Sequence, residues 1–91
     1  MSELTPPTNL IRVHVLLFGA CREAAGSSEL EFELTAPATV NAAFAALTQQ
    51  LPQLAHYERS ALFAVNEEHA RPHQALRNGD TLAIFPPVSG G

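Results

Sequence analysis

The sequence has little of what a nucleic-acid binder, a secreted protein or a membrane protein requires. Its basic side chains are five arginines and no lysine, they form no cluster, and the formal net charge is −4, which argues against a nucleic-acid surface. Cys21 is the only cysteine, so no internal disulfide can form, as is typical of the reducing cytoplasm. No apolar run approaches the roughly 20 residues of a membrane span, and the N-terminus lacks the basic start and apolar core of a secretory signal. We therefore expect a cytoplasmic protein that binds neither nucleic acid nor membrane.

Length and composition indicate one small globular domain. The chain has 91 residues, of which 46% are apolar and 15% are charged, and these values suit a folded core rather than disorder. We expect a flexible N-terminal extension over residues 1–10, a folded domain over residues 11–85 and an extended tail over residues 86–91.

The first third of the chain contains three segments with clear patterns. Residues 11–18 place aliphatic side chains at alternate positions, which predicts a β-strand, and the continuous apolar run over 15–18 predicts a central strand covered on both faces there. Residues 19–26 are rich in alanine between two glycines, which predicts a short helix. Residues 29–34 alternate glutamate with Leu or Phe, so we expect a half-exposed strand that pairs antiparallel with the first.

The middle of the chain predicts the main helix. Thr39 is a suitable N-cap, and the helix should end at Pro52, which lacks the backbone donor that a helix interior needs. Residues 53–60 are expected to form a loop. The apolar residues between these limits fall on one helical stripe: Val40, Phe44, Leu47 and Leu51.

The last third predicts strands separated by turns. Residues 61–66 and 81–85 have the composition of buried strands, and residues 69–71 predict a brief edge strand. Glu67-Glu68 and Asn78-Gly79-Asp80 are expected to form turns, the second with a strong turn signal. The order of elements therefore predicts a small α+β roll in which one helix crosses a sheet.

The chain ends in an unusual tail, Phe85-Pro86-Pro87-Val88-Ser89-Gly90-Gly91. The two prolines fix φ and remove backbone donors, so the tail should leave the domain stiff and extended. Glycine has no Cβ, so a Gly-Gly end can enter a narrow channel and present an unhindered carboxylate. The alternative interpretation is an ordinary frayed terminus.

No other part of the sequence predicts an active site. His69 and His73 are spaced like metal ligands on a helix, but Pro72 lies between them and a third ligand is not evident, so we expect no metal site. Cys21 has two interpretations, a thiol with a pKa lowered by the helix start and Arg22 or a buried or incidental thiol. The glutamates of the second strand are expected to form a solvated face that helps to steer a basic partner: Glu29, Glu31 and Glu33.

Four sets of residues form a pattern that is found in a known family. They are Val15-Leu16-Leu17-Phe18-Gly19-Ala20 with Arg22-Glu23 and Gly26, then Ala64-Val65-Asn66, then Leu76-Arg77-Asn78-Gly79-Asp80, and finally Phe85 to Gly91. In this combination the chain resembles the small subunits of molybdopterin synthase, which are ubiquitin-like sulfur carriers. The resemblance runs from Ile11 to Gly91. It implies an α+β, ubiquitin-like β-grasp fold with a mixed sheet of four to five strands and one main crossing helix.

The resemblance also implies a chemistry. In that family an adenylating, ubiquitin-activating-like enzyme uses ATP to activate the terminal carboxylate, and a sulfur-donating enzyme supplies the sulfur that replaces AMP. The resulting thiocarboxylate donates sulfur within the large subunit of molybdopterin synthase, where cyclic pyranopterin monophosphate becomes molybdopterin. The carrier binds no permanent cofactor and has no active site of its own, and two carriers and two large subunits form a heterotetramer.

The family's functional positions carry over to named residues of this chain. Gly91 is expected to bear the acyl-adenylate and then the sulfur, and Gly90 to give access to it. The rest of the tail should line the partner's channel: Pro86, Pro87, Val88 and Ser89. Three further residues are expected to form the docking surface: Phe18, Arg22 and Phe85. The alternative interpretation places Phe18 and Phe85 in the core at strand ends.

Other functions remain open at this point. Sulfur carriers of thiamin or amino-acid biosynthesis share the Gly-Gly end. A ubiquitin-like modifier would join its terminal glycine to lysines of other proteins, whereas this chain offers no lysine of its own. A plain interaction domain would not need Gly90-Gly91.

Overall fold

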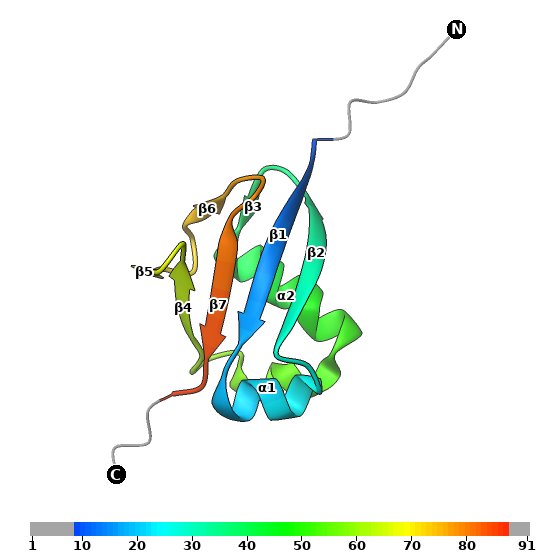
Figure 1. Ribbon diagram of the computed structural model, residues 1–91, viewed down its shortest axis with the longest axis vertical. Helices are drawn as coiled ribbons and strands as arrows, with labels where there is room; N and C mark the ends of the chain where they lie inside the picture. The colour runs from blue at the N-terminus through cyan, green and yellow to red at the C-terminus, as the bar shows by residue number, and fades with distance from the viewer. Residues whose placement is uncertain (1–8, 88–91) are drawn as a thin grey trace, which may run out of the picture.

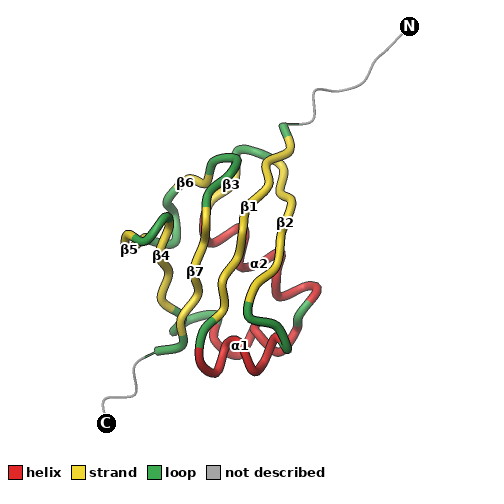
Figure 2. The backbone as a smooth tube through the Cα atoms, viewed as in Figure 1, coloured by secondary structure: helices red, strands yellow, loops and turns green. Residues whose placement is uncertain are grey.

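A computed structural model describes residues 9–87 as a five-stranded sheet with helices on one side, together with a small two-stranded sheet (Figures 1 and 2). The described elements are, in chain order, β1 (Leu10–Leu17), α1 (Gly19–Ala25), β2 (Glu29–Thr35), β3 (Ala38–Thr39), α2 (Val40–Gln50), the 3-10 helix η1 (Pro52–Tyr57), β4 (Leu62–Val65), β5 (Glu68–Ala70), β6 (Ala75–Leu76) and β7 (Thr81–Phe85).

The sheet places the first and last strands side by side at its centre. Its strand order is β2-β1-β7-β4-β5; β1 pairs antiparallel with β2 and parallel with β7, and β4 pairs antiparallel with both β7 and β5. Figure 1 shows α2 crossing behind the sheet, with the opposite face turned to the viewer. The expected α+β fold is confirmed: a mixed sheet with one main crossing helix, the β-grasp arrangement that the resemblance implies.

Helix α2 begins and ends as its sequence predicts. The Thr39 hydroxyl accepts a hydrogen bond from the backbone N–H of Ala42 at 3.1 Å, which satisfies one of the donors left free at a helix start. Leu51 is the C-cap, and Pro52 opens η1. The helix has 11 residues, and none of the helices within residues 9–87 has the length and apolar character needed to cross a membrane.

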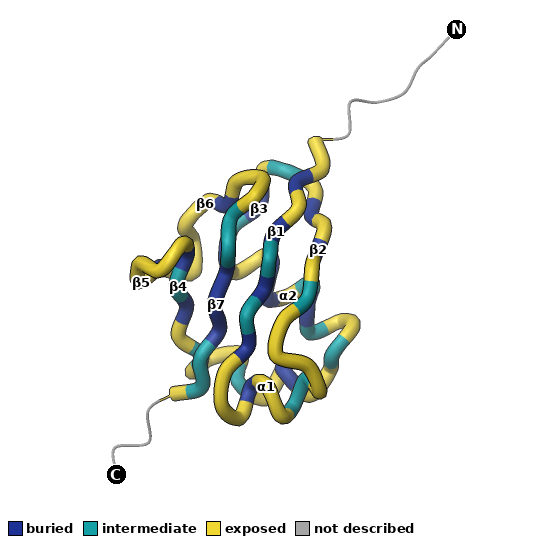
Figure 3. Tube along the Cα trace, viewed as in Figure 1, coloured by how far each residue is buried: buried dark blue, intermediate teal, exposed yellow. Residues whose placement is uncertain are grey.

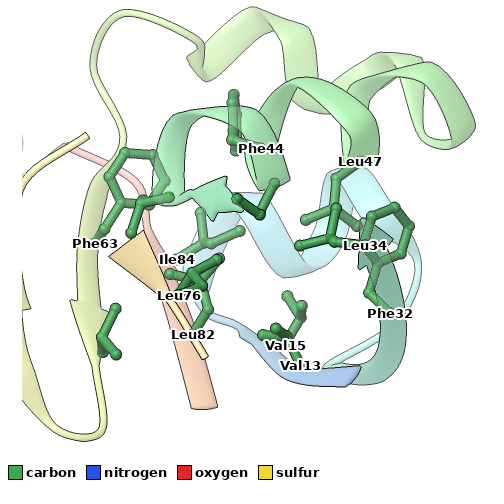
Figure 4. Close-up of a cluster of buried hydrophobic side chains, with 14 of the residues drawn as sticks. Val13, Val15, Phe32, Leu34, Phe44, Leu47, Phe63, Leu76, Leu82 and Ile84 are labelled. Carbon is green, nitrogen blue, oxygen red and sulfur yellow. The ribbon is translucent and has the colours of Figure 1, made fainter. Parts of the chain in front are cut away.

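The core lies between α2 and the sheet (Figures 3 and 4). Phe44 of α2 meets Phe63 of β4 in an edge-to-face contact with ring centroids 5.6 Å apart, a preferred geometry for aromatic pairs. Beneath them, the inward residues of the central strands are fully buried: Val13, Val15, Leu82 and Ile84. Leu54 of η1 is also fully buried, so the segment expected to be a loop contributes to the core as a 3-10 helix.

Three local features of the structure differ from what the sequence predicts. The hairpin turn lies at Asn66 and Glu67, one residue earlier than predicted, so that β5 begins at Glu68. The two-residue strands β3 and β6, which pair with each other, are too short for a recognisable sequence period. The predicted coverage of 15–18 on both faces is wrong: Leu16 is half-buried and Phe18 is exposed, because the helices cover only one face of the sheet.

Candidate functional site

The face of the sheet opposite α2 carries an apolar groove. Successive strand residues point to opposite faces, so the residues that alternate with the buried ones on the central strands lie on the uncovered face. Figure 3 shows this alternation of buried and less buried residues along β1. A hollow of about 520 Å³ lies there. Its small side chains are Ala64 and Ala83, and its residues are Leu16, Phe18, Ala64, Asn66, Glu67, Thr81, Ala83 and Phe85. The small side chains of Ala64 and Ala83 leave room in this hollow for an apolar side chain of another protein.

Two of the three predicted docking residues come together at one end of this groove. The rings of Phe18 and Phe85 stack with centroids 4.7 Å apart and planes 10° apart. The Phe18 N–H donates to the Ile84 carbonyl at 3.1 Å, which fixes the end of β1 beside β7. Phe18 is 41% exposed and Phe85 is half-buried, so the interpretation of Phe18 as a core residue is wrong.

Leu62 adds a third large apolar side chain to this end. It is 41% exposed and lies directly opposite Phe85 in the β4–β7 register, and cross-strand partners project to the same face. Sequence analysis missed this residue as a docking candidate. The alternation within β4 gave a usable signal, because Phe63 and Val65 point inward and leave Leu62 and Ala64 on the open face.

The chain leaves the sheet directly from this aromatic pair. Pro86 and Pro87 follow β7 outside any helix or strand. Gly19 has a φ of +54°, and a Cβ added to it would lie 3.0 Å from Cγ of Pro86, so this glycine allows the start of α1 to lie against the first residue of the tail. The predicted functional residues Val88, Ser89, Gly90 and Gly91 lie outside the described residues.

Arg22, the third predicted docking residue, lies in the last turn of α1. It is exposed, and its backbone N–H donates to the Phe18 carbonyl at 3.2 Å. Within residues 9–87 its guanidinium forms no ion pair. The structure therefore places Arg22 one helical turn from the aromatic pair, with its side chain exposed to solvent.

The opposite half of the open face is charged, and its charges are paired. His14 lies between two carboxylates of β2, with its Nδ1 2.8 Å from Oε2 of Glu31 and its Nε2 2.8 Å from Oε1 of Glu29. These hydrogen bonds, the one to Glu31 first, raise the pKa of His14. Arg12 donates to Glu33 at 2.9 Å. The predicted glutamate face is thus exposed but already matched by β1, which weakens the idea that it steers a basic partner.

A network of hydrogen bonds centred on Asn66, called the Asn66 bracket below, lies at the end of the groove away from Phe18 and Phe85. The Asn66 side chain accepts a hydrogen bond from the Thr81 N–H at 2.9 Å and donates to Oδ1 of Asp80 at 2.9 Å, while its backbone N–H donates to the Thr81 carbonyl at 2.8 Å. Oδ2 of Asp80 accepts from the Arg77 N–H at 2.8 Å. The β4–β5 turn is therefore fastened to the start of β7, a long-range contact that local sequence patterns do not reveal.

The remaining candidates lie away from the groove. Cys21 is buried in the core, and burial raises the pKa of its thiol; the interpretation as a buried thiol is confirmed, and a lowered pKa is contradicted. His69 lies on β5, and His73 lies in the segment that leads to β6. Among residues 9–87, no three His, Cys, Asp or Glu side chains are grouped so as to hold a metal ion.

The chain is similar to proteins named as sulfur carrier subunits over nearly its whole length. The family described as the ThiS family matches residues 15–91. A molybdopterin synthase sulfur carrier subunit from Chlamydomonas reinhardtii is 39% identical, over 89% of this chain and 100% of that protein. The subunit of the same name from Mycobacterium tuberculosis is 35% identical, over 90% of this chain and 100% of its own length.

Solved structures agree on the fold. SAMP1 from Haloferax volcanii superposes with a TM-score of 0.78 at 33% identity, covering 88% of this chain and 99% of its own. A chain from the complex of subunits 1 and 2 of the molybdopterin-converting factor from Helicobacter pylori superposes with a TM-score of 0.60 and covers 89% of this chain and 100% of its own. Its sequence identity is 22%, so this match supports the fold alone. The chain therefore belongs to the ThiS family, and its resemblance to the sulfur carrier subunits of molybdopterin synthase is confirmed.

Proposed function

We propose that this chain is the sulfur-donor subunit of a cytoplasmic molybdopterin synthase, and that its working group is a thiocarboxylate on Gly91. The relatives that share 35–39% of its residues carry the name of that subunit. In this proposal the chain binds no permanent cofactor and has no independent active site. Its partners are the large synthase subunit, an adenylating enzyme that uses ATP, and a sulfur-donating enzyme.

The observation that carries the proposal is the exposed aromatic pair at the root of the tail. A partner that takes the tail into a channel must contact the surface from which the tail departs, and Phe18, Phe85 and Leu62 form that surface. Exposed aromatic side chains beside an arginine are typical of protein interfaces. Docking on this cluster would direct Pro86 and the residues after it into the partner.

The chemistry follows from the properties of a carboxylate. A free carboxylate is a poor acyl donor because its leaving group would be oxide. Adenylation by ATP, which releases pyrophosphate, makes AMP the leaving group instead. Sulfur then displaces AMP and forms a thiocarboxylate, whose soft, ionised sulfur is a good nucleophile at neutral pH. Inside the large subunit this sulfur would attack cyclic pyranopterin monophosphate, and a second carrier would supply the other sulfur of the dithiolene.

Intact mass spectrometry tests the proposal. The chain is incubated with its adenylating enzyme, ATP and a sulfur donor, in parallel with a form that lacks Gly91. We expect a mass gain equal to one oxygen replaced by sulfur only when Gly91 is present. A loaded chain that fails to bind the large subunit would point to a carrier of thiamin or amino-acid biosynthesis, and no loading by an active enzyme would contradict the carrier role.

One observation favours a second candidate function, that of a ubiquitin-like modifier. A second structure from Haloferax volcanii, named small archaeal modifier protein 1, is 31% identical to this chain and has a TM-score of 0.76. A modifier would transfer the activated Gly91 to lysines of other proteins, and it could not form chains on its own side chains because it has no lysine. Recovery of covalent adducts from cells would support this function, and their absence beside a loaded thiocarboxylate would favour the synthase.

A further inference from the structure

The turn between β4 and β5 holds a glutamate in a backbone conformation that favours glycine. The φ angles of Asn66 and Glu67 are 52° and 72°, so both residues occupy the left-handed region. Glycine adopts this region freely and asparagine tolerates it, whereas glutamate and other long side chains are disfavoured there. Two-residue hairpin turns of this type usually place glycine at the second position, where this chain has Glu67.

The surrounding hydrogen bonds hold the turn in place. Asn66 is fastened to Thr81 through two backbone-directed hydrogen bonds and to Asp80 through its amide. This bracket keeps Glu67 at the rim of the apolar groove, on the side away from the Phe18–Phe85 pair. Backbone strain at such a position often marks a functional requirement for the side chain.

Glu67 is an exposed acidic residue at the rim of the groove. Glu67 is exposed, and within residues 9–87 it forms no ion pair and no side-chain hydrogen bond. The carboxylates of Glu29, Glu31 and Glu33 on the same face are already paired with β1. Among residues 9–87, Glu67 thus supplies a carboxylate without an ion-pair partner on the border of the groove.

We propose that Glu67 is a specificity residue of the docking surface, which pairs with a lysine or arginine of the large subunit while an apolar side chain of that subunit fills the hollow over Ala64 and Ala83. This inference rests on the proposed function, because it assumes that the large subunit covers the groove. An exposed rim charge contributes more to the association rate and partner choice than to the final affinity. The strained turn therefore serves recognition at some expense of the domain's own stability.

The chain offers a matched control for this charge. Glu68 follows Glu67 directly and is also exposed, but it pairs in register with the inward-facing Val65 and lines a different hollow, with Gln74, Ala75 and Arg77. Glu67→Gln and Glu68→Gln remove the same charge one residue apart and from opposite sides of the sheet. Glu67→Gly removes the same charge and also places glycine, which accepts a positive φ, in the left-handed position. A loss of binding without a loss of stability in this variant would therefore be an effect on recognition and not on folding.

The test measures association and dissociation rates of the four chains with the large subunit at ionic strengths on the order of 0.01 M and 0.5 M. We expect Glu67→Gln and Glu67→Gly to slow association by about two- to fivefold at low salt, the range of an exposed ion pair, and to match the wild type at high salt. Glu68→Gln should associate like the wild type. Glu67→Gly should also melt at or above the wild-type temperature, because glycine accepts the turn.

The outcomes separate this inference from the function on which it rests. If the large subunit binds the wild type and loses affinity for Phe18→Ala while Glu67→Gln associates normally, the role of Glu67 is refuted and the docking surface stands. An equal loss in Glu68→Gln, or a loss that persists at high salt, also refutes a specific charge pair at Glu67. A large subunit that does not bind the wild-type chain overturns the proposed function and this inference with it.

Discussion

The two faces of the sheet carry similar apolar side chains in different surroundings. On the face covered by α2, Phe44 and Phe63 are buried and contact each other. On the open face, Phe18 and Phe85 also contact each other, yet Phe18 remains 41% exposed. Burial stabilises the folded state in proportion to the apolar area removed from water, so the covered pair should set the stability of the domain. The open pair keeps part of its apolar area exposed to solvent, where a partner can cover it.

The largest expected effect is on the covered face. Phe44→Ala should lower the free energy of unfolding by about 3–5 kcal/mol, because it removes a fully buried ring and leaves a cavity. Small domains have total stabilities of about 5–15 kcal/mol, so this variant should unfold at much lower urea. Denaturation followed by circular dichroism measures the change. A loss no larger than that of Phe18→Ala would contradict the assignment of the core to this face.

On the open face, removing an aromatic ring should affect binding to a partner more than it affects the stability of the domain. Phe18→Ala should cost less stability than Phe44→Ala, because it removes an aromatic contact of about 0.5–1.5 kcal/mol and a ring that is only partly buried. It should weaken binding to the large subunit by about 2 kcal/mol or more, as for an interface hot spot. Titration calorimetry with the large subunit measures the affinity. Unchanged affinity with an intact fold would refute the docking surface.

The smallest expected effect concerns the charged half of the open face. The pKa of His14 is raised in the folded state by hydrogen bonds to Glu31 and Glu29. A raised folded-state pKa means that the protonated histidine stabilises the fold fully below its unfolded pKa of about 6.5. This stabilisation disappears as the pH rises through the folded-state pKa.

The comparison of wild type with His14→Gln should therefore show the larger stability difference at acidic pH and a vanishing difference at alkaline pH. An NMR titration of the His14 ring gives the pKa directly, and Glu31→Gln should lower it toward the ordinary value. A His14 that titrates at or below about 6.5 in the wild type would contradict the paired arrangement.

Local patterns predicted most of the fold. Alternation over residues 29–34 and the Thr39 cap identify β2 and the start of α2 because these signals depend on neighbouring residues. The β3–β6 pair was missed because two-residue strands have no period of their own. The full coverage expected at residues 15–18 was wrong because a sequence alone does not say which sheet face the helices leave open.

The sequence predicted only part of the site, because the rest depends on which strands lie side by side. Phe18 and Phe85 were named from the family pattern, and the parallel pairing of β1 with β7 is what brings them together. Leu62 was missed because its role depends on its register opposite Phe85. The Asn66 bracket and the pairing of His14 with two glutamates likewise depend on contacts between strands that are distant in sequence.

The most direct test of the account is a single-turnover sulfur transfer. The thiocarboxylated chain, freed of its adenylating enzyme, is mixed with the large subunit and cyclic pyranopterin monophosphate, and molybdopterin is measured against the thiocarboxylate that remains. We predict that molybdopterin forms at the expense of the thiocarboxylate, two carriers for each product, and that Phe18→Ala slows its formation. A chain that binds the large subunit but keeps its sulfur, with no molybdopterin formed, would contradict the account.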